Sequence, residues 1–99
     1  MNTLVAIDMK KLEGHSTKIT GILRALSNAN RLLILARLVD SEACVSELEE
    51  ALEIHQPTLS QQLGVLRSES LVLTRRDGKN IFYRIADDST IIFLKALCE

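Results

Sequence analysis

The sequence predicts a mainly α-helical domain that carries one β-hairpin, in the order α-α-α-α-β-β-α. Two observations lead to this fold class. Apolar residues recur at helical spacing over most of the first two thirds of the chain. The period then changes to two short runs rich in β-branched and aromatic residues, 71–76 and 81–85, on either side of an Asp-Gly pair. With 99 residues the chain has room for one core, so we expect a single domain over residues 1–99.

The helices expected near the two ends of the chain differ in their apolar surfaces. Residues 18–26 place apolar side chains at i, i+3, i+4 and i+7, which is the stripe of an amphipathic helix. Residues 89–98, which Asp88 or Ser89 can cap, are apolar around nearly the whole circumference. A helix of that kind must be buried on all sides, so we expect a partner subunit to cover it.

Three further helices are expected between these two. Residues 29–39 have a broad apolar surface and should form the central helix of the core. The next helix is expected to begin near Ser46, because Ser46 and Glu49 have the spacing of a capping box. The last of the three runs from about 56 to 68, with Pro57 in its first turn, where the missing N–H is not needed.

The polar face of the helix at 56–68 carries amide and hydroxyl groups where a solvated helix usually has Glu and Lys. Its leucines fall on one side, and the other side presents Pro57, Thr58, Ser60, Gln61, Gly64 and Arg67. Amides and hydroxyls suit hydrogen bonds to base edges, since Gln can pair with adenine through two bonds. An ordinary surface helix of low charge is the competing interpretation.

Charge is unevenly distributed, although the net charge is only −1. Residues 41–54 hold five glutamates and no basic residue, whereas residues 55–84 hold five basic side chains against two acidic ones. Four of those basic side chains surround the Asp-Gly turn: Arg75, Arg76, Lys79 and Arg84. Positive charge at a hairpin tip suits DNA phosphates, although a solvated face is the commoner reason for a charge run.

Two helices joined by a short turn and followed by a basic hairpin are the plan of a winged helix-turn-helix. We assign residues 46–68 to the helix-turn-helix and residues 71–85 to the wing. The residues expected to contact DNA are Gln56, Pro57, Thr58, Ser60, Gln61, Gln62, Arg67, Arg75, Arg76, Lys79 and Arg84.

Three motifs on this unit resemble the ArsR/SmtB family of dimeric bacterial repressors. They are LSNANRLLIL at residues 26–35, SQQLGVL at residues 60–66, with Gln62 in place of the family's usual His, and GKNIFY at residues 78–83. The run QPTLSQQLGVLR at residues 56–67 looks most like the BigR-like branch, whose members respond to sulfide or oxidants.

The resemblance implies a homodimer held by the helices at 18–26 and 89–98, with its two recognition helices in successive major grooves. Such a dimer would be a transcriptional repressor that binds an imperfect palindromic operator in double-stranded DNA. The resemblance also implies that an effector releases the DNA.

Cys44 and Cys98 are the candidate sensing residues, and thiol, persulfide or oxidant chemistry is slightly favoured over metal binding. The branch's usual pair of thiols is not reproduced. Ala36 stands where its first cysteine is expected, and Cys98 falls about one turn short of the second. A bridge between Cys44 and Cys98 would require their Cα atoms to lie within about 7 Å of each other.

Zinc is the other effector that the sequence leaves open. The run EACVSEL at residues 42–48 is similar to the metal box of the family's metal sensors, with Ser46 where a second thiolate would stand. Cys44 and Glu47, joined by His15, could supply a thiolate, a carboxylate and an imidazole in tetrahedral geometry. A small apolar role for Cys44, without sensing, carries equal weight.

Other classes of function find little support. The sequence has no Gly-rich phosphate loop, no CxxC and no HExxH, so we do not expect an enzyme. No run of 18 apolar residues exists and residues 1–12 do not resemble a signal peptide, so we expect a cytoplasmic protein without a membrane partner. The alternative to a repressor is a winged-helix module that binds only other proteins, through its glutamate-rich helix.

Overall fold

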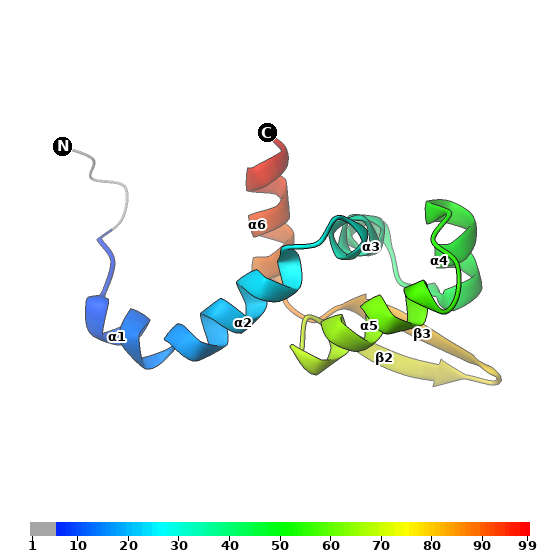
Figure 1. Ribbon diagram of the computed structural model, residues 1–99, viewed down its shortest axis with the longest axis horizontal. Coiled ribbons are helices and arrows are strands. Elements are labelled where there is room, and N and C mark those ends of the chain that lie inside the picture. Colours follow the sequence, from blue (N-terminus) through cyan, green and yellow to red (C-terminus); the bar gives the residue numbers. More distant parts are fainter. Residues whose placement is uncertain (1–5) are drawn as a thin grey trace.

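Six helices and a three-stranded antiparallel sheet make up residues 6–99, the part of the chain that the computed structural model describes (Figure 1). The elements are α1 (Met9–Gly14), α2 (Ser16–Leu26), α3 (Ala29–Asp40), β1 (Ala43–Cys44), α4 (Val45–Leu52), α5 (Thr58–Ser68), β2 (Val72–Asp77), β3 (Asn80–Ile85) and α6 (Asp88–Cys98). The predicted fold class is therefore confirmed, with two short elements, α1 and β1, that the sequence analysis did not anticipate.

The core lies where α3, α4 and α5 meet the sheet. Leu59, Leu63 and Leu66 form the predicted apolar stripe of α5 and are fully or almost fully buried. They belong to one core cluster with Ile34 and Leu35 of α3, which are also inaccessible to solvent. The expectation that residues 29–39 form the central helix is thus confirmed. Because the leucines of α5 pack into this core, the opposite side of α5 faces outward.

The sheet has the strand order β1-β3-β2, and β2 and β3 form the wing. Pairing extends to Asp77 and Asn80, so that only Gly78 and Lys79 form the loop. Gly78 has φ of 64°, a left-handed conformation that two-residue hairpin loops require and glycine adopts without strain. The wing is therefore a tight hairpin that is longer at its tip than the runs 71–76 and 81–85 suggested.

The starts of α4, α5 and α6 differ from the expectation. Helix α5 begins at Thr58, with Pro57 as its N-cap and not in its first turn. Cys44 is the N-cap of α4, and Glu47 accepts a hydrogen bond from the Cys44 backbone N–H at 3.0 Å, so the capping pair is not Ser46 and Glu49. The short pairing of β1 with β3 sets this start, since the extended chain ends at Cys44. At α6 the cap is Asp87, whose carboxylate accepts from the Ser89 N–H, and not Asp88 or Ser89.

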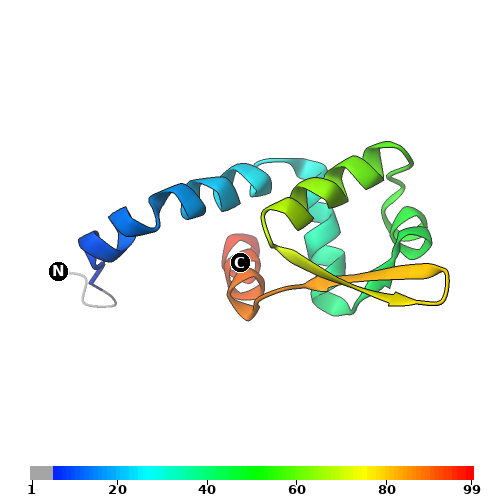
Figure 2. The same ribbon diagram turned by 90° about the horizontal axis from the view of Figure 1, so that it is seen from below.

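Helices α1 and α2 extend away from the tip of the wing, and α6 follows directly on β3 at the base of the wing, with a groove between α6 and α2 (Figures 1 and 2). Helix α1 has no buried residue, and α2 and α6 leave large apolar side chains open to solvent. The molecule is elongated, with extents of 51 × 28 × 22 Å. None of the helices within residues 6–99 is long and apolar enough to cross a membrane.

Candidate nucleic-acid interface

Helix α5 turns its amide and hydroxyl side chains outward. Ser60, Gln61, Gly64 and Arg67 are all exposed, and Thr58 at the margin is partly buried. At Gly64, an added Cβ would meet no atom within 4 Å, which shows how open the middle of this face is. The described part of the chain therefore leaves bare the surface that the sequence analysis assigned to base edges.

A side chain that precedes α5 accepts a hydrogen bond from a backbone N–H in the first turn of this helix. Gln56 accepts a hydrogen bond from the Ser60 N–H at 3.0 Å through its side-chain oxygen, and Pro57 is the N-cap residue. Free N–H groups at a helix start attract anions, and the Gln56 carbonyl satisfies one of them. Gln56 and Pro57 are exposed at the same end of the interface as Ser60.

Gln62 differs from its neighbour Gln61, because its side chain is partly buried and already bonded. Its oxygen accepts a hydrogen bond of 2.7 Å from Nη1 of Arg31, in the first turn of α3. Gln61 is exposed, and no hydrogen bond engages its side chain within residues 6–99. The two adjacent glutamines therefore have different environments.

The basic side chains of the wing lie on opposite faces of the hairpin. Arg76 pairs with Ile81 and shares a face with the buried Val72, so it is on the side where the helices pack. Arg75 pairs with Phe82 and lies on the other face, together with Arg84. Arg76 and Arg84 are exposed, as is Lys79 in the loop.

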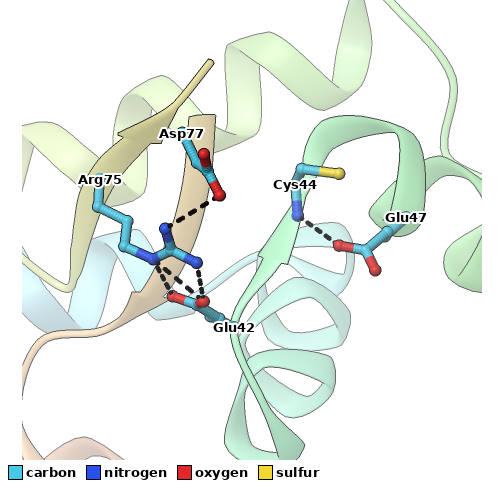
Figure 3. Close-up of polar contacts among 5 residues, drawn as sticks. All are labelled: Glu42, Cys44, Glu47, Arg75 and Asp77. Carbon is cyan, nitrogen blue, oxygen red and sulfur yellow. Dashed lines mark hydrogen bonds and ion pairs between the residues drawn. The ribbon is translucent and has the colours of Figure 1, made fainter. Parts of the chain in front are cut away.

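Arg75 is engaged by two carboxylates and an aromatic ring (Figure 3). Its guanidinium donates through Nε and Nη2 to Glu42, lies 3.8 Å from Asp77 and stacks 4.6 Å from the centroid of the Phe82 ring. The hydrogen bond from Arg75 lowers the pKa of the Glu42 carboxyl, because it favours the ionised carboxylate. Arg75 is thus the one wing cation whose charge is already paired within the described chain.

Cys44 is buried at the junction of β1 and α4. Its Sγ lies 3.3 Å from Ser46 Oγ and points away from Arg75 (Figure 3). Cys44 lines a pocket of about 350 Å³ together with Lys79 and Tyr83 of the wing. The N–H of Cys44 holds the pKa of Glu47 below its ordinary value, because the bond favours the ionised carboxylate. The cysteine thus connects the start of the helix-turn-helix with the wing.

The other candidate sensing groups lie elsewhere. Cys98 is exposed at the end of α6, and both views place α3 between α6 and α4 (Figures 1 and 2). Both cysteines are free thiols. His15 lies between α1 and α2, at the opposite end of the molecule from Cys44 and Glu47. Within residues 6–99 no three metal-binding side chains come together, so the suggested zinc set does not fit one subunit.

The sequence did not indicate the roles of two residues of this region, Glu42 and Arg31. Glu42 was noted as part of an acidic run and of the EACVSEL run, and no local pattern connects it with Arg75, 33 residues later. Arg31 belongs to the LSNANRLLIL motif, which marks it as a residue of interest without indicating its partner, Gln62.

Comparison with known proteins agrees with this architecture. Residues 28–73 match the family described as "Bacterial regulatory protein, arsR family". The Biofilm growth-associated repressor of Agrobacterium fabrum is 44% identical over 92% of this chain and 78% of its own length. The crystal structure of the transcriptional repressor BigR from Xylella fastidiosa superimposes with a TM-score of 0.82, at 41% identity, over 92% of this chain and 93% of that one.

A more distant solution structure is also similar. The homodimeric winged helix-turn-helix DNA-binding domain Mb0332 of Mycobacterium bovis has a TM-score of 0.79 at 28% identity, over 96% of this chain and 86% of that domain. The match covers both the helix-turn-helix and the helices outside it. This chain is a winged helix-turn-helix protein and belongs to the arsR family of bacterial regulatory proteins.

Proposed function

We propose that the protein is a transcriptional repressor that binds a palindromic operator in double-stranded DNA as a homodimer, in the bacterial cytoplasm. The observation that carries the proposal is the bare amide-and-hydroxyl face of α5 beside a wing with exposed basic side chains. Repressors of this fold place the second helix of the helix-turn-helix in the major groove. The related proteins of Agrobacterium and Xylella are both named as repressors.

The contacts divide by chemistry. Thr58, Ser60 and Gln61 present hydroxyl and amide groups for base edges, with Gln56 and Pro57 at the start of the same face. The exposed cations would bind phosphates, which fix the register of the protein without selecting a sequence. They are Arg67, Arg76, Lys79 and Arg84. Arg75 is assigned a smaller part, because Glu42 already pairs with it.

The homodimer is proposed from the apolar surface that α2 and α6 form. A groove of about 220 Å³ between α2 and α6 is lined mainly by Ile19, Ile22, Leu23, Leu26 and Phe93. Ile92 and Leu97, on the same helix as Phe93, are 68% and 62% exposed. A monomer seldom leaves so much contiguous apolar surface in water, and the similar domain from Mycobacterium bovis is described as homodimeric.

Salt dependence tests whether the protein binds DNA at all. The four exposed cations named above would give a dimer about eight phosphate contacts, so affinity for random duplex DNA should fall by roughly 10³–10⁵ between about 50 and 200 mM salt. Fluorescence anisotropy with a labelled duplex measures this slope. A winged-helix module that binds only proteins would show no affinity for the duplex even at low salt, and that result would overturn the proposal.

The release of DNA is assigned to Cys44. A group added to this buried thiol would disturb β1, which pairs with the wing strand β3, and also the start of α4. Purified protein bound to its operator should therefore release it on treatment with a persulfide donor or hydrogen peroxide, whereas the Cys44→Ser variant should stay bound. Zinc and a Cys98→Ser variant serve as comparisons in the same assay. Release that survives the Cys44 substitution would exclude this thiol as the sensor.

A further inference from the structure

One guanidinium joins the end of α2 to the middle of the proposed recognition helix. Arg31, at the start of α3, donates through Nε to the carbonyl of Ala25 and through Nη2 to that of Arg24, the latter at 3.3 Å. Its Nη1 donates to the side-chain oxygen of Gln62 at 2.7 Å. The last carbonyls of a helix lack partners within that helix, and a planar, fully charged guanidinium can bind several acceptors in fixed directions.

A pocket lies between α2 and α5, so the hydrogen bonds of Arg31 matter more for the contact between these two helices. A pocket of about 190 Å³ separates the two helices, and Arg31 and Val65 form part of its wall. Close contact occurs again at the far end of α5, where the Glu69 carboxylate lies against Gly21, 2.8 Å from the position of an added Cβ. The helices thus meet through polar side chains at separate points, with a pocket between them.

We infer that Arg31 is a positioning residue that fixes the orientation of α5 relative to α2, and that Gln62 serves as its acceptor and contacts no base. This inference rests on the proposed function and deepens it. Because α2 lines the apolar groove proposed for the dimer, the hydrogen bonds of Arg31 connect that surface with the recognition helix.

The neighbouring glutamines allow a matched test. Gln62→Glu keeps an oxygen acceptor and adds a charge that Arg31 can pair with, so we expect operator affinity to stay within about threefold of wild type. Gln61→Glu adds the same charge to the exposed face, where phosphates and base acceptors repel it, and should lower affinity at least about 100-fold. Gln62→Leu removes the acceptor and should cost about 30-fold, or ~2 kcal/mol at about 1.4 kcal/mol per tenfold change.

Rescue by the conservative variant separates positioning from simple packing. In an Arg31→Met background no guanidinium pairs with the added carboxylate. Gln62→Glu should then lower operator affinity as much as Gln61→Glu does in the wild type. A Gln62→Glu variant that loses as much affinity as Gln61→Glu in the presence of Arg31 would overturn the inference, because the side chain would then face the DNA.

A measurement without DNA separates this inference from the proposed function. Urea unfolding of Arg31→Met, Gln62→Leu and the double variant forms a double-mutant cycle, and coupling of the two sites is expected because they share a partly buried hydrogen bond. Additive effects would refute the link even if DNA binding is intact. Clear coupling in a protein without affinity for DNA would uphold the Arg31 link and reject the proposed function instead.

Discussion

Ile92→Glu should convert the dimer into a monomer and lower operator affinity by about 10²–10⁴, since each half-site would then be bound without the help of the other. Ile92 is 68% exposed on α6, so the substitution removes no contact within its own subunit's core. A glutamate there would have to be buried, unpaired, against the partner's apolar surface, which costs several kcal/mol in each subunit. Analytical ultracentrifugation measures the oligomeric state, and anisotropy measures the affinity.

Leu73→Glu is the control for this experiment. Leu73 is 42% exposed on the wing strand β2 and does not line the groove between α2 and α6, so the same charge in place of a similar side chain should leave the dimer intact. An Ile92→Glu protein that sediments as a dimer would place the subunit interface on another surface.

Gln61→Ala should weaken specific binding much more than nonspecific binding, whereas Arg76→Ala should weaken both to a similar degree. A lost bidentate base contact costs about 1–3 kcal/mol, or roughly 5–150-fold, for the operator and almost nothing for random DNA. A lost phosphate contact reduces binding to any duplex and makes the salt dependence shallower by about one unit of slope. Titrations with operator and scrambled duplexes at several salt concentrations measure both effects.

Arg75→Ala is the matched comparison for the wing. Arg75 and Arg76 are adjacent on β2, but Glu42 and Asp77 pair with the first of them. Removing Arg75 should therefore change DNA affinity less than removing Arg76. A Gln61→Ala variant that loses specific and nonspecific binding equally, as Arg76→Ala is expected to, would contradict the division between base contacts and phosphate contacts.

The parts of the fold that follow from local patterns could be predicted from the sequence. The spacing of Leu59, Leu63 and Leu66 determines which side of α5 is buried, and hence which side is free. The Asp-Gly pair marks the wing because a left-handed residue is needed at its tip. Both features depend on interactions within a few residues, and periodicity reveals these well.

Features that depend on distant partners could not be predicted. The start of α4 is set by the pairing of Ala43 and Cys44 with β3, which lies almost 40 residues further on. For this reason the N-cap is Cys44, and the local capping signal at Ser46 is not used. Arg75 looks like any other wing cation until the chain brings Glu42 beside it. Gln62 looks like a second Gln61 until the packing of α3 on α5 brings Arg31 within reach.

The pairing of Arg75 with Glu42 has a consequence for how quickly the protein could search a genome. A cation that already has a counter-charge displaces no counterion from DNA. Each wing therefore lacks close to one unit in the slope of log affinity against log salt concentration. Attraction of that kind holds a protein equally at every position along a chromosome. Weakening it shortens the time spent at wrong positions, while the hydrogen bonds formed at the correct one are unchanged.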